Sequence, residues 1–224
     1  MAEGYVQHQK KQADKIIRIT ERLYMERGME GFTIGDIADG AEITRATVYN
    51  YFSCKEDILW AIFFGKMDGL LLRLNEKFKD ANTTFERLRA YAEANYEYYN
   101  EDPTFAIFFD LFHTIFATAN AKPEDFWDNP YNTSNWRPGK TIRMFTEHFH
   151  DGSVKADLDP DSTVVSYYYA FLGTVSFTFK NKDELSKFYG LDYLKVARTQ
   201  IEWILQSIKA SPPPPPPPPP PRGR

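Results

Sequence analysis

Apolar residues recur at intervals of three and four along most of the chain, which is the spacing of one face of an α-helix. The pattern predicts a first helix that ends at Gly28, a short helix after Thr33, another after Thr44 and a long helix over residues 58–78. Each threonine hydroxyl can accept a backbone N–H as an N-cap, and Thr33 begins TIGD, a capping-box sequence. We therefore expect three helices, the last two joined by a tight turn at residues 40–42, before the long one.

The long helix is expected to start at a second capping box, Ser53–Glu56, which reads SCKE. The later helices are less sharply bounded, with Pro103, Pro138 and Asp161 or Ser162 as their first-turn or capping residues. We place them near residues 84–100, 103–119, 138–151, 161–180 and 191–211, with a loop over 122–136.

One segment, VVSYYYAFLGTVSFTF at residues 164–179, is apolar on almost every side. Its β-branched and aromatic residues would also suit a strand, but a run this long without a turn favours a helix that is covered on more than one side. The last helix has an apolar stripe of its own. Because neither helix has another obvious cover, we expect a homodimer in which two copies pack these helices into a four-helix interface.

The chain has 224 residues, of which 42% are apolar and 16% aromatic, and this is enough to bury a sizeable core. The single cysteine, Cys54, excludes an intrachain disulfide framework and fits a reducing compartment. The first residues lack the apolar stretch of a signal peptide, and the longest strongly apolar run, ILWAIFF, is too short to cross a bilayer. We expect a soluble, cytoplasmic protein that spans no membrane and uses no cofactor.

The net charge of −4 argues against a protein that binds nucleic acid through bulk positive charge, so such binding needs a local basic patch. Residues 5–18 form one candidate, in which four Lys and Arg side chains outnumber one Asp. Over residues 1–60, however, eight Lys and Arg side chains face ten Asp and Glu side chains. Charge alone therefore gives only weak support for nucleic-acid binding.

The stretch ITRATVYNYFSCKEDIL carries many hydrogen-bonding side chains on a short amphipathic helix. A short helix, a tight turn and a second short helix of this kind are what a helix-turn-helix motif requires. Arg45 can bind guanine bidentately, Thr47 can contact a thymine methyl and Asn50 can read adenine. Val48 and Phe52 lie on the opposite, apolar side and are expected in the core.

The sequence FTIGDIADGAEITRATVYNYFSCKEDIL, residues 32–59, resembles the N-terminal domain of the TetR family of ligand-responsive transcriptional regulators. The family pattern is similar to I-A-x-x-A-G-V-S-x-x-x-x-Y-x-Y-F-x-x-K-E-x-L. The resemblance is close over residues 10–60 and continues only in the order of helices and in DGSVKADLDPD, which looks like the loop before the family's eighth helix. Glu42 stands where the family usually has glycine, so a positive φ is expected there. The matching residues are Ile37, Ala38, Ala41, Ile43, Thr44, Tyr49, Tyr51, Phe52, Lys55, Glu56 and Leu59.

The resemblance implies an all-α protein with two helical domains. Residues 1–52 would form a three-helix, helix-turn-helix DNA-binding domain, and residues 53–211 a larger C-terminal ligand-binding and dimerisation domain, followed by a polyproline tail at 212–224. The resemblance also implies which side chains touch DNA: Arg45, Thr47 and Asn50 would face base edges, while Thr33, Thr44, Tyr49, Tyr51 and Lys55 would lie near phosphates.

Two ring-rich segments, at residues 105–116 and 166–179, are first of all core and interface material. Together with the resemblance, their density of rings with polar tips indicates a pocket for a mostly apolar ligand. No cluster of Arg or Lys falls in these helices to neutralise an anion, so we expect an apolar or aromatic, weakly charged small molecule. The expected lining is Phe108, Phe112, His113, Phe116, Trp136, Tyr168 and Phe171.

An enzyme is a rival class with little support. RPGKT at residues 137–141 resembles the end of a phosphate-binding loop, but Ser134 stands where that loop requires glycine. The G-x-S-x-G, H-E-x-x-H and C-x-x-C motifs are absent from the sequence. His148 and His150 are two residues apart, which on a helix points them in different directions. We therefore expect neither a catalytic constellation nor a metal site.

The chain is accordingly expected to be a sequence-specific, DNA-binding transcriptional regulator. As a homodimer it would act on a palindromic operator in double-stranded DNA, most simply as a repressor that a small ligand releases. The alternative from another class is a protein-interaction adaptor that uses its ten consecutive prolines, residues 212–221, with DNA binding secondary. Titration with random and selected DNA separates the two, because only a regulator should show a large specificity ratio.

Overall fold

The computed structural model describes residues 2–118 and 128–211. In that part of the chain every regular element is a helix, apart from one isolated antiparallel bridge between Val154 and Lys209, and the all-α fold class is confirmed. The polyproline tail expected over residues 212–224 lies outside the described residues. The helices are α1 (Ala2–Arg27), α2 (Ile34–Ala41), α3 (Arg45–Tyr49), α4 (Lys55–Phe78), α5 (Thr84–Glu101), α6 (Phe105–Thr118), α8 (Pro138–Thr146), α9 (Pro160–Lys180), α10 (Lys182–Tyr189) and α11 (Tyr193–Ile208).

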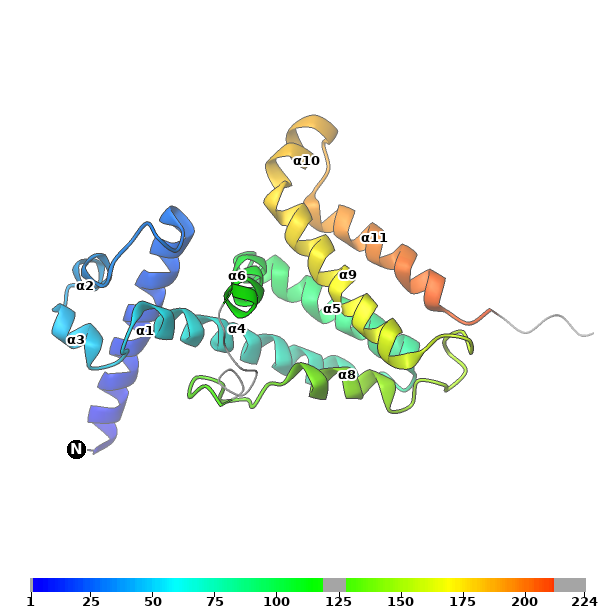
Figure 1. The fold of residues 1–224 in the computed structure, drawn as a ribbon, viewed down its shortest axis with the longest axis horizontal. Helices are drawn as coiled ribbons and strands as arrows, with labels where there is room; N and C mark the ends of the chain where they lie inside the picture. The colour runs from blue at the N-terminus through cyan, green and yellow to red at the C-terminus, as the bar shows by residue number, and fades with distance from the viewer. Residues whose placement is uncertain (1, 119–127, 212–224) are drawn as a thin grey trace, which may run out of the picture.

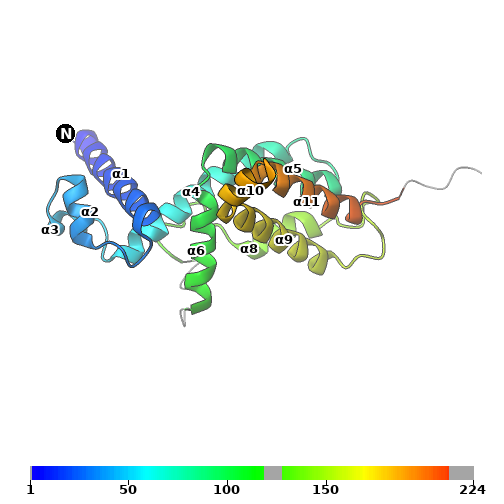
Figure 2. The ribbon, with the colours of Figure 1, turned by 90° about the horizontal axis from the view of Figure 1, so that it is seen from above.

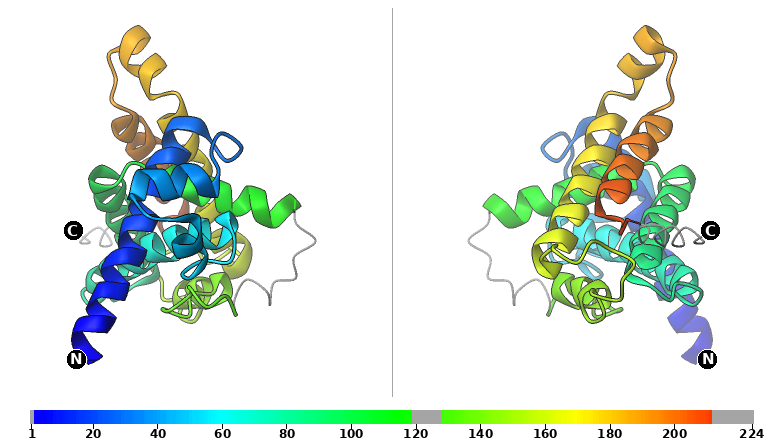
Figure 3. Two further views of the ribbon diagram at one scale, coloured as in Figure 1. Left: turned by 90° about the vertical axis from the view of Figure 1, so that its left-hand side faces the viewer. Right: turned by 90° about the vertical axis from the view of Figure 1, so that its right-hand side faces the viewer.

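The helices form a small N-terminal group and a larger bundle. Figure 1 shows α1, α2 and α3 together at one end of the molecule, with α4 running from them into the bundle. Within the bundle, α4 packs on α5, α5 packs on α8 and α11, and α9 packs on α11. In Figure 2 the far end of α6 extends away from the bundle, and Figure 3 shows the same from both sides. The long α4 is thus the main connection between the two groups.

The sequence-based start signals of α2 and α3 are confirmed. Thr33 Oγ1 accepts the Asp36 N–H at 3.3 Å while Asp36 Oδ2 accepts the Thr33 N–H at 2.8 Å, which completes a capping box. Thr44 Oγ1 accepts the N–H of Thr47 at 3.1 Å. As expected, α1 ends just before Gly28, whose φ of 69° favours glycine.

The capping box expected at the start of α4 is wrong. The helix begins at Lys55 with Cys54 as its N-cap, and no side-chain cap hydrogen bond is made there. Ser53 lies one residue too early to serve as the cap. Its backbone N–H donates instead to Asp57 Oδ2 at 3.0 Å, so a carboxylate of the first turn holds the chain where it enters the helix.

The expected bounds of the C-terminal helices also need correction. Asp159, rather than Asp161 or Ser162, caps α9 by accepting the Ser162 N–H at 2.9 Å, because Pro160 is suited to the first helical position. The helix α8 ends at Thr146, several residues earlier than expected. The pattern also missed α10, an eight-residue helix with no buried residue.

The two long C-terminal helices cover each other only in part. The stripe of α11, which includes Ile201 and Leu205, is buried within the chain. The premise that this stripe has no cover inside one subunit is therefore wrong, because α9 and α5 pack on α11. On α9, however, Phe177 stays 70% exposed and Tyr169 58% exposed. None of the described helices has the length and apolarity needed to cross a membrane.

Buried apolar side chains form two clusters, which we call the N-terminal core and the bundle core. The N-terminal core joins α1, α2 and α3 to the first turns of α4, and it also contains Phe108 and Leu111 from α6. The bundle core contains Phe109 and Phe112 from the same helix. Neighbouring residues of α6 therefore belong to different cores.

A part-buried ionic cluster also joins the two groups of helices. Lys66 on α4 places its ammonium 2.7 Å from Glu21 Oε1 of α1 and 2.5 Å from Asp102 Oδ2 at the end of α5. It also donates to Thr104 Oγ1 at 3.0 Å and lies 5.3 Å from the centroid of the Phe108 ring. One ammonium thus holds α1, α4 and the turn between α5 and α6 together.

Candidate nucleic-acid interface

The turn between α2 and α3 is closed by backbone hydrogen bonds. Glu42 has φ 55° and ψ 44°, the left-handed conformation expected from its place in the turn, and its N–H donates to the Asp39 carbonyl at 3.1 Å. The next N–H, of Ile43, donates to the Ala38 carbonyl at 3.0 Å. From α1, Lys15 Nζ lies 3.3 Å from Glu42 Oε2. The turn is therefore tight although a non-glycine residue occupies it.

The five-residue α3 has one buried and one exposed side. Val48 is 0% exposed and Phe52, just after the helix, is 4% exposed, so the prediction that they are core residues is confirmed. Arg45 and Asn50 are exposed, and the Tyr49 side chain is 54% exposed. The exposed side thus carries hydrogen-bonding groups that point away from the N-terminal core.

Gly35 is a residue of this region that the sequence analysis missed. A Cβ atom built on Gly35 would lie 2.6 Å from a guanidinium nitrogen of Arg45, so any larger residue would displace that side chain. Arg45 therefore rests against the first turn of α2, in a place that only glycine leaves open. The available signal was the glycine at the second helical position of TIGD, where helix propensity disfavours it.

The side chains expected near phosphates differ in their burial and in the hydrogen bonds that they make within the chain. Thr33 and Thr44 serve as N-caps at exposed positions, and Tyr51 is half-buried against the N-terminal core. Thr47, expected at the bases, is half-buried, and its hydroxyl lies 2.9 Å from that of Thr44.

The ammonium of Lys55, which was expected near a phosphate, makes several contacts within the chain. Its ammonium donates to the Met29 carbonyl at 2.5 Å and to the Phe32 carbonyl at 3.3 Å, and it lies 4.8 Å from the centroid of the Phe32 ring. An ammonium has three N–H groups. Lys55 therefore ties the α1–α2 turn to α4.

Two acidic residues of the motif, Asp36 and Glu42, are paired with bases. Arg27 Nη1 lies 3.4 Å from Asp36 Oδ1, and Lys15 pairs with Glu42. The hydrogen bonds from Thr33 lower the pKa of Asp36, with a further contribution from Arg27. Pairing reduces the repulsion that these carboxylates would otherwise exert on a phosphate backbone. Arg45 on α3 makes no ion pair with the described residues.

The residues expected to line a ligand pocket do not surround one cavity. Phe112 is stacked on Phe63 with ring centroids 4.4 Å apart, and Trp136 lies 5.7 Å from Phe112. Phe108 instead faces Tyr24 of α1 at 5.1 Å, in the N-terminal core. Further along the bundle, Phe171 is fully buried beside Tyr91 and Tyr96, and Tyr168 contacts Tyr91 and Phe109. The side chains of His113 and Phe116 lie outside the described residues.

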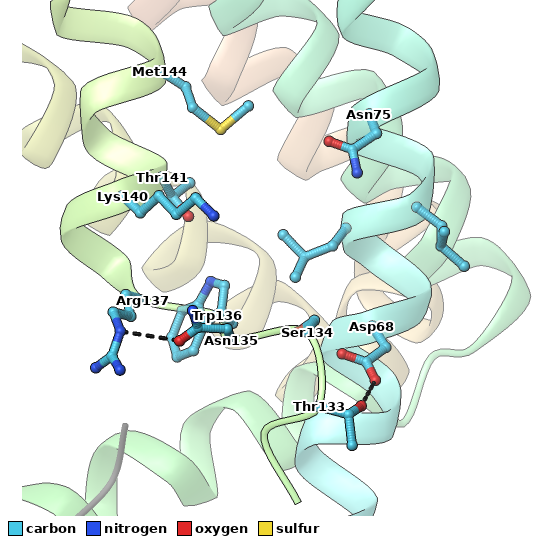
Figure 4. Close-up of a pocket in the computed structure, with 12 residues that line it drawn as sticks. Asp68, Asn75, Thr133, Ser134, Asn135, Trp136, Arg137, Lys140, Thr141 and Met144 are labelled. Carbon is cyan, nitrogen blue, oxygen red and sulfur yellow. Dashed lines mark hydrogen bonds between the residues drawn. The ribbon is translucent and has the colours of Figure 1, made fainter. Parts of the chain in front are cut away.

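Only Trp136 of the expected lining contacts a surface cavity of about 420 Å³, which lies between α4, residues 133–137 and α8. Figure 4 shows this cavity with its lining side chains. The segment that forms one wall begins beside Tyr131, whose ring centroid lies 5.8 Å from that of Phe52. The wall of the cavity is therefore continuous with a contact at the end of α3.

No metal centre is found in the part of the chain that the structure describes. Across residues 2–118 and 128–211, no three His, Cys, Asp or Glu side chains form a group that could hold a metal ion. Burial raises the pKa of the Cys54 thiol, so this thiol lacks the activation of a nucleophile. The best candidate site is thus the set of exposed hydrogen-bonding side chains at α3. The arrangement of α1 to α4 defines the class of the protein, which is a helix-turn-helix protein.

Comparison with known proteins shows which family of helix-turn-helix proteins the chain is similar to. The family described as "Bacterial regulatory proteins, tetR family" matches residues 16–62. The transcriptional repressor KstR2 of Mycobacterium tuberculosis H37Rv is 29% identical over 83 residues, which are 37% of this chain and 42% of KstR2. The fatty acid metabolism regulator protein of Bacillus subtilis 168 is 34% identical over 74 residues, or 33% of this chain and 38% of that protein. The match to the TetR family thus covers the N-terminal helices, and the chain aligns with only about two fifths of each of these relatives.

Solved structures share the fold over nearly the whole described chain. The ketosteroid regulator KstR2 of M. tuberculosis has a TM-score of 0.61 at 19% identity, covering 89% of this chain and 95% of that one. FadR of B. subtilis, solved with stearoyl-CoA, has a TM-score of 0.62 at 21% identity, covering 87% and 98%. The relatives are regulatory proteins rather than enzymes, which agrees with the sequence-based conclusion that the chain is not an enzyme.

Proposed function

We propose that this chain is a sequence-specific, DNA-binding transcriptional repressor that acts as a homodimer. The observation that carries the proposal is the exposure of Arg45 and Asn50 at α3, while Val48 and Phe52 are buried in the N-terminal core. A helix of this width can enter the major groove while its apolar side stays in the core. The repressor function of the KstR2 relatives supports the sign of regulation.

In this proposal Arg45, Thr47 and Asn50 read base edges. The side chains that contact phosphates are Thr33, Thr44, Tyr49, Tyr51 and Lys55. Lys55 also stabilises the α1–α2 turn through its hydrogen bonds to two carbonyl groups there. Residues 1–52 form the DNA-binding domain, and residues 53–211 form the domain for ligand binding and dimerisation.

The dimer is proposed to form through α9 and α11. The support is no longer the buried stripe of α11 but the large apolar side chains that the two helices leave exposed, Phe177 at 70% and Trp203 at 69%. Large exposed apolar surfaces mark interaction sites, and exposed rings on both helices fit such a surface. A two-fold dimer would hold the recognition helices about 34–36 Å apart, which matches a palindromic operator.

An effector with an apolar body is proposed to release the operator. The relatives support this class, since one is described as a ketosteroid regulator and another was solved with stearoyl-CoA. They give no support to the adaptor alternative, because they are regulators.

The test is a genomic operator selection followed by titration of the selected and a random duplex at one salt concentration. A regulator should prefer the selected duplex by a factor on the order of 10³ or more. Arg45→Ala should lose about 1–3 kcal/mol of binding free energy and relax specificity at one base pair. Lys155→Ala, exposed in the segment before α9, serves as the control. Unchanged affinity of Arg45→Ala for the selected site would show that α3 is not the reading helix.

A further inference from the structure

The cavity between α4 and α8 has an apolar middle. Leu71 and Leu72 come from α4, Met144 comes from α8 and the ring of Trp136 comes from the segment that leads into α8. In Figure 4 the side chains of Trp136 and Met144 lie between the two helices. The volume of about 420 Å³ lies within the range of pockets that hold small ligands, about 300–1,000 Å³.

One wall of this cavity is cationic. Arg137 and Lys140, at the N-terminus of α8, both line it, and they belong to the RPGKT sequence that is no nucleotide-binding loop. Figure 4 shows the Lys140 side chain extended from α8 toward α4. Its ammonium makes no side-chain hydrogen bond or ion pair within the described part of the chain. Arg137 sits at the rim, where it donates to Asn135 Oδ1 at 3.1 Å and pairs with Asp128 Oδ1 at 3.5 Å, an exposed contact that a ligand can replace.

The wall on α4 carries an unsatisfied acceptor. Asp68 Oδ2 accepts the Thr133 hydroxyl at 2.8 Å. Asp68 Oδ1 is shielded from solvent and has no hydrogen-bond partner among the described residues. A buried carboxylate oxygen without a donor is costly, so a ligand that brings an O–H or N–H group to it would remove that cost.

We propose that this cavity binds an amphipathic anion. A carboxylate or phosphate group lies against Lys140 and Arg137, an apolar body lies along Leu71, Trp136 and Met144, and an O–H or N–H donor of the ligand reaches Asp68. The proposal rests on the proposed function, because it names the site and chemical class of the effector. It replaces the expectation of a weakly charged ligand, since the cations come from the start of α8 rather than from the ring-rich helices.

The position of the cavity connects a ligand to the DNA-binding end. The same α4 that carries Asp68 and Leu71 also contributes Ile58 and Leu59 to the N-terminal core. The opposite wall is continuous with Tyr131, which packs on Phe52. A ligand that binds one tilt of α4 better than another would therefore shift the equilibrium between two placements of α3. The free energy of that shift equals the difference between the ligand's binding free energies for the two arrangements.

The experiment uses isothermal titration calorimetry on the purified full chain without DNA. The probes are a ten-carbon 2-hydroxy carboxylate, the matching alkyl phosphate, the uncharged ten-carbon 1,2-diol and inorganic phosphate. Both amphipathic anions should bind on the order of tenfold more tightly than the diol, because charge-assisted hydrogen bonds are the stronger ones. Inorganic phosphate alone should bind poorly, since it has no apolar body.

Variants locate the site. Lys140→Ala should reduce the affinity for both amphipathic anions on the order of tenfold and leave that for the diol unchanged. Lys155→Ala, exposed and not part of the cavity, is the matched control. Equal binding of acid and diol, no binding of any probe, or an unaffected Lys140→Ala would each overturn the proposal. Operator affinity of the ligand-free chain is measured separately, so a failure of DNA binding is distinguishable from a failure of this site.

Discussion

Replacing Lys66 by methionine would remove the ammonium that joins α1, α4 and the α5–α6 turn while keeping most of the volume of the side chain. Lys66 is 10% exposed, and its partners Glu21 and Asp102 are 28% exposed. Removing one partner of a buried pair costs about 3–5 kcal/mol, because the remaining charges lose their compensation. Partial exposure of both carboxylates favours the lower end, about 3 kcal/mol. For a chain of this size that lowers Tm by about 6–12 °C.

The measurement is thermal and urea unfolding followed by circular dichroism at one protein concentration, since a dimer makes Tm depend on concentration. Lys77→Met is the matched control, because Lys77 lies on the same helix and pairs with Glu97 at 2.6 Å in an exposed setting, which is worth about 1 kcal/mol or less. Neutralising both partners in the Lys66→Met background should recover part of the loss. If Lys66→Met costs no more than Lys77→Met, the cluster does not stabilise the junction as argued.

Three further outcomes are expected. Glu42→Gly should be about 1 kcal/mol more stable to urea than Glu42→Ala, because both lose the Lys15 ion pair but only glycine relieves a φ of 55°; equal stabilities would contradict this. Phe177→Glu should give a monomer in light scattering at micromolar concentration, and a persistent dimer would place the interface elsewhere. Thr33→Ala should destabilise the chain more near neutral pH than in acid, since the hydrogen bond that lowers the Asp36 pKa acts only on the carboxylate; a pH-independent difference would refute it.

Local signals in the sequence predicted the helix starts and the turn of the helix-turn-helix motif well, because they depend on neighbours in the chain. Thr33 and Thr44 cap their helices as expected, and Glu42 takes the left-handed conformation that its place in the turn requires. The ring-rich helices were harder, because the direction of each ring depends on contacts with distant segments. Phe108 and Phe109 are adjacent in sequence, yet they lie in different cores.

The cationic wall of the cavity was missed for a related reason. RPGKT was compared with a nucleotide-binding loop, and that comparison fails on a single glycine. What makes Lys140 of interest is a packing relation, since it stands across a cavity from Asp68 on a helix some seventy positions earlier. No periodicity or motif reports such a pairing.

The division of α6 between the two cores bears on how the molecule opens. Because Phe108 and Leu111 complete the N-terminal core, α1, α2 and α3 cannot separate from the bundle without exposing these side chains to water. Local opening of the DNA-binding end should therefore cost more free energy than its own few helices suggest, and amide hydrogens in α1 should exchange at rates close to those of α4. A fragment that stops at residue 52 would lack these contacts along with those of Ile58, Leu59 and Ile62, and would lose the cooperative unfolding of the intact chain.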